Sequence, residues 1–156
     1  MGNEKKAAEE EQVMKPKDLY NSPVEIGARI VLLLAGLSRT LDLDELIFLD
    51  YASIYSGDFQ GGASLHPMML NRLAELVRRR EIFPGAIRLF TSKGLMTSRV
   101  DEQGIRYSVT EAGRAFAANL TTDYHAGFRQ RVSWAEGNMD YLMVQRRTIY
   151  KVERAV

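Results

Sequence analysis

The side chains able to act in catalysis or to bind a metal are few and scattered in this sequence. Histidine occurs at His66 and His125 alone, and neither has a second ligand residue at helical spacing, so we expect no metal site. Asp50 lies within an apolar stretch, where an unpaired carboxylate would be costly to bury. It either forms an internal hydrogen bond or salt bridge, or serves as a catalytic carboxylate. The absence of a second acid or ligand residue beside it in sequence favours the internal partner.

The motifs of the common enzyme classes do not occur. Residues 57–62 are rich in glycine but lack the lysine and the strand–loop–helix setting of a phosphate-binding loop. No dinucleotide fingerprint follows a strand, and no Ser or Thr lies in a nucleophile elbow. The chain has 156 residues and no cysteine, which excludes disulfides and thiolate zinc sites. We therefore expect a protein that is not an enzyme and has no cofactor.

Basic side chains are the best candidates for binding. They are concentrated in the stretch after residue 77, at Arg78, Arg79, Arg80, Arg88, Lys93, Arg99 and Arg106. Three interpretations stay open. They could form an ordinary solvated face, contact phosphates with strongly salt-dependent affinity, or dock on an acidic surface of a partner protein.

The distribution of charge is uneven although the net charge is only +1. Residues 19–65 carry two basic and six acidic side chains, whereas residues 66–106 carry eight basic and four acidic ones. Residues 129–156 carry six basic and three acidic side chains. This pattern predicts a polarised surface, whose basic side is modest for a dedicated DNA-binding protein.

The elements that would position these residues are mostly helices. Ser22, followed by Pro23 and Glu25, predicts a helix start, and that helix runs to about Leu37. Gly27 within it would permit a close helix contact. A second helix over residues 43–55 is apolar on nearly all sides, so we expect it to be buried with the other elements packed around it. Residues 56–67 should form a loop, and a third helix should follow Pro67.

A break over residues 81–85 is expected to separate this third helix from a short one at residues 84–93. The period then changes, with strands predicted at residues 95–100 and 105–109 around a turn. This order predicts a mainly α winged helix-turn-helix over residues 19–120, in which the hairpin is the wing and residues 84–93 occupy the recognition position. Asp101 and Glu102 at the wing tip would be repelled by phosphates.

The two ends of the chain extend this domain. Residues 1–18 are interpreted as a mobile tail, and residues 121–156 as C-terminal helices that pack on the domain or on a partner. The last helix has a loose seven-residue apolar spacing, which is either internal packing or a seam for a partner helix, formed by Leu142, Ile149, Val152 and Val156. No apolar run is long enough to cross a membrane, and no signal core begins the chain, so we expect a cytoplasmic protein.

Several separated motifs resemble one family, the middle component of ABC-three-component systems. The motifs are, in chain order, Asn21–Gly27, Leu49–Tyr51 with Ser56–Asp58, Ser64–Pro67, Glu75–Arg79 and Lys93–Leu95. The resemblance covers roughly residues 20–135. Family members usually have a more polar, small-residue segment after the His-Pro pair, where this chain has Met68–Asn71.

The resemblance implies an accessory subunit without catalysis of its own, as in Lamassu-type bacterial defence against phages and plasmids. It would bind an SMC/Rad50-like ABC ATPase and help couple DNA sensing to an effector such as a nuclease. DNA would be contacted within the complex and only weakly by the isolated chain. The alternative is a stand-alone winged-helix transcriptional regulator, which would dimerise and bind a palindrome.

Overall fold

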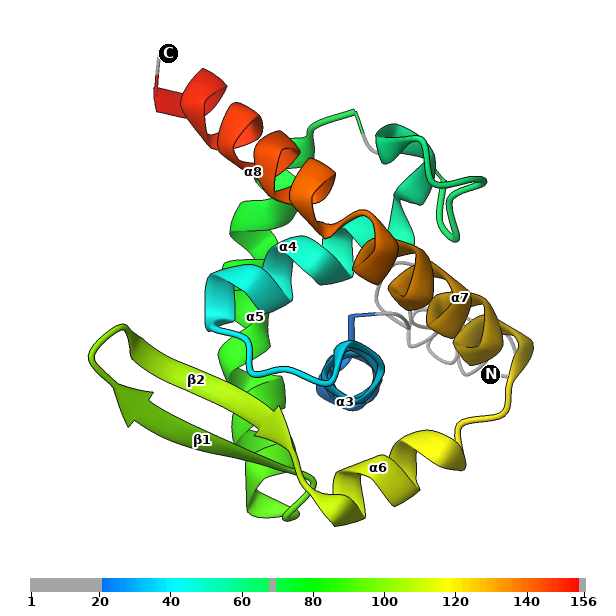
Figure 1. The fold of residues 1–156 in the computed structure, drawn as a ribbon, viewed down its shortest axis with the longest axis vertical. Coiled ribbons are helices and arrows are strands. Elements are labelled where there is room, and N and C mark those ends of the chain that lie inside the picture. The colour runs from blue at the N-terminus through cyan, green and yellow to red at the C-terminus, as the bar shows by residue number, and fades with distance from the viewer. Residues whose placement is uncertain (1–20, 68–69, 155–156) are drawn as a thin grey trace, which may run out of the picture.

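The computed structural model describes residues 21–67 and 70–154. The predicted tail at residues 1–18 lies outside the described residues. The described part is mainly helical, with helices α3 (Pro23–Leu37), α4 (Leu43–Ile54), α5 (Arg72–Ser92), α6 (Glu111–Ala118), α7 (Asp123–Gly137) and α8 (Met139–Arg154), labelled as in Figure 1. A short 3₁₀ turn at Ser56–Phe59 follows α4, and an antiparallel hairpin of β1 (Met96–Asp101) and β2 (Gly104–Val109) follows α5. This order, with the hairpin as the wing, confirms the predicted winged-helix class.

Two helices form the centre of the core. Figure 1 looks down α3, with α4, α5, α6 and α7 around it. α3 buries nearly all of its apolar side chains, and every residue of α4 from Leu46 to Ile54 is buried. Helix α4 is therefore buried as predicted, but α3 is buried as well and shares the centre of the core with it. Gly27 explains part of this arrangement, because a Cβ there would overlap the ring of Phe90 on α5.

Capping residues account for where the helices begin. The Ser22 side chain accepts a hydrogen bond from the backbone of Glu25 at 3.2 Å, which begins α3. Asp42 and Glu45 form a reciprocal capping box at the start of α4, with hydrogen bonds of 2.7 and 3.0 Å. These local contacts satisfy backbone N–H groups that have no partner within the helix.

The third helix differs from the prediction in two ways. It begins at Arg72, where the Asn71 side chain accepts from the Ala74 N–H at 2.9 Å, rather than at Pro67. It also continues through residues 81–85, with Pro84 inside it, so the predicted break and separate short helix are wrong. Proline removes one helical hydrogen bond. The inward stripe of α5 nevertheless continues without a shift on both sides of it, through Leu76, Arg79, Phe83, Ala86, Ile87 and Phe90. Burial of this stripe outweighs the local proline penalty.

The wing is anchored near its middle and exposed at its tip. Leu41 and Tyr107 exchange two backbone hydrogen bonds of 3.1 and 2.8 Å, so Leu41 pairs with β2 as an isolated antiparallel bridge. Arg106 donates to the hydroxyl and carbonyl oxygens of Thr40 at 3.0 and 2.9 Å. The outer half of the hairpin is exposed and extends away from the helices in Figure 1.

The last two helices extend the domain. α7 adds Phe128, Val132 and Ala135 to the same core. Arg131 on α7 also donates to the Ala63 carbonyl at 2.7 Å, which ties the glycine-rich loop to this helix. α8 then crosses toward α4 and the middle of α5 (Figure 1).

Candidate binding surfaces

Asp50 is the centre of a buried charge network that joins three helices. Its carboxylate accepts from Arg29 of α3 at 2.7 and 3.2 Å and from Arg79 of α5 at 3.1 Å. Burial alone would raise the pKa of the Asp50 carboxyl, but the two guanidinium groups outweigh it and lower that pKa below its ordinary value. The carboxylate therefore stays ionised and occupied by its partners.

Arg79 connects this network to a second buried carboxylate, that of Glu75. Its Nη1 donates to the carboxylate of Glu75, one helical turn earlier. Its guanidinium also lies 5.5 and 5.9 Å from the ring centroids of Tyr51 and Tyr55, in reach of a cation–π interaction. Two buried cations and two carboxylates thus neutralise one another, which is the arrangement of a structural network.

The two histidines have separate environments. His66 Nε2 lies 3.1 Å from the Tyr124 hydroxyl, and burial lowers the pKa of His66 to about 4, so the ring is neutral at pH 7. His125 is buried, with Nδ1 2.7 Å from the Thr122 hydroxyl and Nε2 3.7 Å from a carboxylate oxygen of Glu25. Within residues 21–67 and 70–154, no cluster of three His, Asp or Glu side chains is placed to hold a metal ion.

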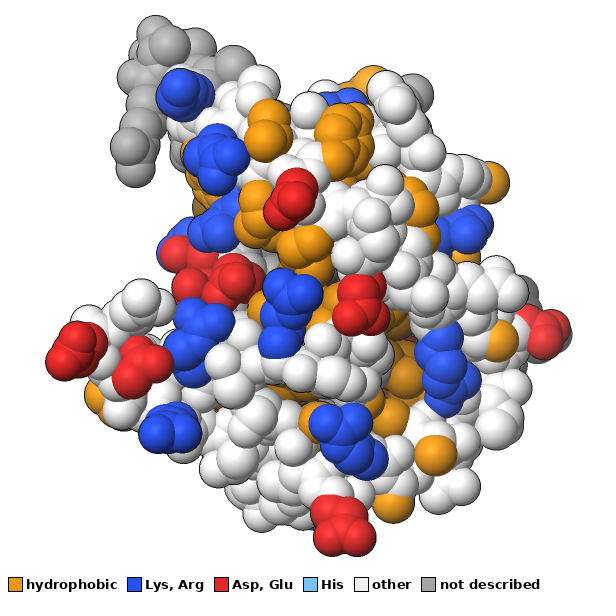
Figure 2. Space-filling model, viewed as in Figure 1, with side chains coloured by type: hydrophobic (Ala, Val, Ile, Leu, Met, Phe, Trp, Pro, Cys, Tyr) orange, Lys and Arg blue, Asp and Glu red, His pale blue; other side chains and the backbone are white. Residues whose placement is uncertain are grey.

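The structure separates the basic residues that are close together in sequence. Arg79 is in the core, and Arg106, near the middle of the wing, is held by Thr40, with Glu45 3.4 Å away. Arg80 is 52% exposed and donates to Asp44 at the start of α4. Arg78 is half-buried, whereas Arg88, Lys93 and Arg99 are exposed. Figure 2 shows acidic side chains interspersed among the basic ones on this face.

The apolar residues of the proposed C-terminal seam face inward where the structure describes them. Leu142 is fully buried, and Ile149 is half-buried against the core. The Val152 side chain and Val156 lie outside what the structure describes. The described half of this seam is therefore occupied by the domain itself.

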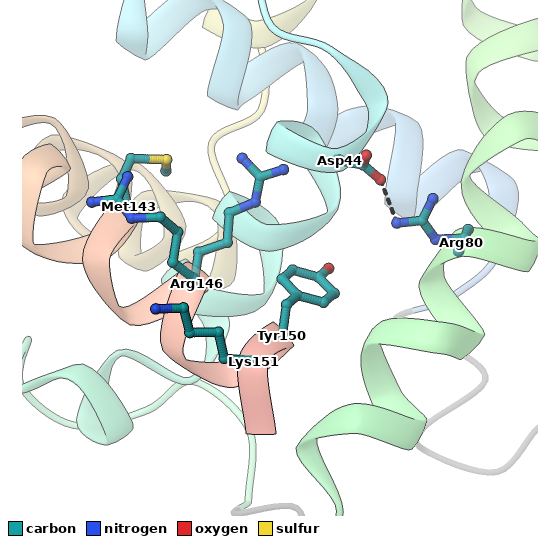
Figure 3. A pocket seen from close by; sticks show the side chains of 7 residues that line it. Asp44, Arg80, Met143, Arg146, Tyr150 and Lys151 are labelled. Carbon is teal, nitrogen blue, oxygen red and sulfur yellow. Dashed lines mark hydrogen bonds and ion pairs between the residues drawn. The ribbon is translucent and has the colours of Figure 1, made fainter. Parts of the chain in front are cut away.

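A pocket that the sequence reasoning missed lies beside α8. It has a volume of about 620 Å³ and is lined by α4, α5 and α8, through Asp44, Arg80, Met143, Arg146, Arg147, Tyr150 and Lys151 (Figure 3). Figure 3 shows the Arg80–Asp44 pair on one side of the pocket and α8 on the other, with Tyr150 turned toward the pair and Lys151 turned away from it. The available sequence signal was the spacing of Met143, Arg147, Tyr150 and Lys151, which places them on one helical face.

The wing tip is a second exposed feature. Val100 and Ile105 are paired across the hairpin and are 76% and 50% exposed. Asp101 and Glu102 follow directly in the turn, and Figure 2 shows acidic side chains at the outer end of the hairpin. An acidic tip with an apolar pair is poorly suited to phosphate contact.

These features define a winged-helix fold, with a buried charge network in its core and a charged, partly apolar pocket on its surface. A family model, that of the ABC-three component (ABC-3C) system Middle Component 2, matches residues 19–152. The chain belongs to this family and is thus a component of a multi-subunit system. No curated protein and no solved structure matches the chain. Among the described residues, no helix combines the length and apolarity needed to cross a bilayer.

Proposed function

We propose that this protein is a non-catalytic accessory subunit of a cytoplasmic bacterial defence complex. It binds an SMC/Rad50-like ABC ATPase and helps to couple the sensing of foreign DNA to an effector subunit, such as a nuclease. Membership of the middle component family over residues 19–152 is the observation that carries this proposal. It places the chain among proteins that work together with other subunits.

The placement of the charged residues supports a role in binding. Asp50, which the sequence offered as a possible catalytic carboxylate, accepts from two guanidinium groups and is fully buried. The surface instead offers the α8 pocket and the wing tip, where charge and apolar area lie side by side. Such mixed surfaces are typical of protein interfaces, in which apolar contacts supply affinity and charges supply orientation.

Co-expression with the SMC/Rad50-like ATPase of the same system tests the proposal. We expect the two chains to co-purify and to elute together in size-exclusion chromatography at low salt. Separate elution of two folded proteins under these conditions would contradict the proposal. The isolated chain should show no ATP hydrolysis and no nuclease activity, whereas its addition should change the DNA-dependent ATPase rate of the partner.

A stand-alone DNA-binding regulator is the second candidate, because α5 precedes the wing and so occupies the recognition position. Three observations weigh against it. Arg79 of this helix is buried, Arg80 is paired with Asp44, and the wing tip is acidic. Sequence-selective binding of a palindrome by the isolated protein at physiological salt would favour the regulator. Weak, salt-sensitive and sequence-blind binding would favour the accessory subunit.

A further inference from the structure

We propose that the pocket between α4, α5 and α8 is the docking site for an acidic, amphipathic peptide segment of another subunit. The inference rests on the proposed function, in that it takes the segment to belong to a partner in the same complex. Two features of the pocket support it: basic side chains on α8 without a described carboxylate partner, and apolar side chains beside them.

The first observation is that the three α8 cations that line the pocket have no carboxylate partner among the side chains that the structure describes. Arg80 on the opposite wall is paired with Asp44. Arg146, Arg147 and Lys151 make no ion pair with any residue in the described part of the chain. Arg147 and Lys151 are also four residues apart, a spacing at which like charges repel one another on a helix. Carboxylates from outside the chain would relieve this repulsion.

The helix dipole accounts for only part of this pattern. Cations near the C-terminal end of a helix are stabilised by the dipole wherever they lie around the helix. It does not explain why the cations of α8 line a recess together with Met143 and Tyr150. Their placement on one face indicates that this face meets a ligand.

The second observation is the apolar part of the pocket. Met143 and Tyr150 are half-buried within it, and Val144, beside Met143 on the same helix, is 47% exposed. A peptide that alternates acidic and apolar side chains on one face would contact both kinds of wall. A nucleic-acid backbone would leave the apolar wall formed by Met143 and Tyr150 unused. The composition therefore favours a protein segment over nucleic acid.

The size of the pocket sets the size of the segment. A volume of about 620 Å³ is in the range of sites that bury a few side chains of a ligand. It is too small for a domain and fits one or two turns of a helix or a short extended peptide. The pocket is therefore an anchoring point within a larger contact.

Charge reversal in the pocket tests the inference. In the double variant Arg146→Glu and Arg147→Glu, we expect the affinity for the purified ATPase subunit, measured by isothermal titration calorimetry, to fall at least about tenfold, because like charges then face each other. The matched control is the double variant Arg39→Glu and Arg114→Glu, which makes the same change in net charge at exposed positions outside the pocket. The control should bind within about threefold of the wild type. Circular dichroism would establish that both variants are folded.

The outcomes separate this inference from the proposed function. If the wild type binds neither the ATPase nor the effector subunit, the proposed function fails, and the inference fails with it. If the wild type binds and the pocket variant binds equally well, the inference alone is overturned. If labelled single-stranded or duplex oligonucleotides lose affinity for the pocket variant while subunit binding is unchanged, the pocket is a nucleic-acid site and the inference is overturned.

A photo-crosslinking residue identifies the occupant directly. With p-benzoylphenylalanine in place of Tyr150, illumination of the complex should produce a crosslink to a partner peptide that contains Asp or Glu beside apolar residues. A crosslink to residues 1–20 of the same chain, or to the Asp101–Glu102 wing tip of a second copy, would identify a different occupant and overturn the inference. So would the absence of any crosslink in a complex that has formed.

Discussion

Arg29 on α3 and Asp50 on α4 face each other in the protein interior, with Nε 2.7 Å from Oδ1 and neither side chain accessible to solvent. The pair is 21 residues apart in sequence, and Arg79 joins it from α5. It therefore sets the relative positions of the three helices that form the winged-helix core. A buried network of this kind gives little net stability when intact, but it is costly to break, since removal of one partner leaves an unpaired charge inside.

The substitution Asp50→Asn should destabilise the fold strongly. It removes the negative charge that Arg29 and Arg79 share and leaves the buried network with a net positive charge, so we expect the free energy of unfolding to fall by about 3–5 kcal/mol. Urea denaturation followed by circular dichroism measures this. The matched control is Asp44→Asn, which removes a carboxylate from the exposed pair with Arg80 and should cost about 1 kcal/mol or less. Equal effects of the two substitutions would show that burial of the network does not matter.

Because His66 is buried in its neutral form, the free energy of unfolding should depend on pH in the range where this histidine titrates. Burial lowers the pKa of His66 to about 4 in the folded protein, below the ordinary value of 6.5. Between these two values the unfolded chain binds the proton more readily, so the folded state loses stability as the pH falls from about 6.5 to about 4. We expect the variant His66→Gln, which keeps a polar group near Tyr124, to have a flatter profile in this window. Asp50 adds its own loss at lower pH, because its folded pKa is lowered. A parallel profile for His66→Gln and wild type would contradict the assignment.

The sequence contains the local part of this architecture but not its long-range part. The cap residue Ser22 predicted the start of α3, because a cap contacts backbone only three residues away. Pro84 suggested a helix end, but the continuous inward stripe of α5 prevails over a single missing hydrogen bond. Here tertiary packing overrides a local rule.

For the candidate sites too, the sequence predicted which residues needed partners but not which distant residues would meet them. That Asp50 needs a partner could be inferred from its apolar surroundings, but Arg29 and Arg79 could not be identified, since they are 21 and 29 residues away. The basic residues 78–80 look equivalent in sequence, yet one is buried and one is exposed, because helical rotation separates them. The pocket could not be predicted, because it exists only where α8 crosses α4 and α5.

The close contact between α3 and α5 predicts opposite effects for two glycine substitutions. A Cβ at Gly27 would overlap the Phe90 ring, so Gly27→Ala should lower the free energy of unfolding by about 1–3 kcal/mol despite the better helix propensity of alanine. At Gly85 the nearest atom to a new Cβ is the end of the Arg88 side chain, 3.9 Å away. Gly85→Ala should therefore stabilise α5 by about 0.5–1 kcal/mol. Thermal unfolding of both variants tests this. Stabilisation by Gly27→Ala would contradict the packing of the two helices.

The acidic wing tip predicts how the isolated protein interacts with DNA. Asp101 and Glu102 are exposed in the hairpin turn, so their replacement by lysine should leave the free energy of unfolding unchanged within about 0.5 kcal/mol. If the tip approaches a duplex when the protein binds, Asp101→Lys with Glu102→Lys should raise the affinity for a labelled duplex of arbitrary sequence. It should also steepen the dependence of that affinity on salt, since new phosphate contacts release counterions. Fluorescence anisotropy at several salt concentrations measures both quantities, and Glu111→Lys with Asp123→Lys, at exposed positions on other elements, controls for net charge. Equal gains in the two double variants would mean that the wing tip has no special position relative to DNA.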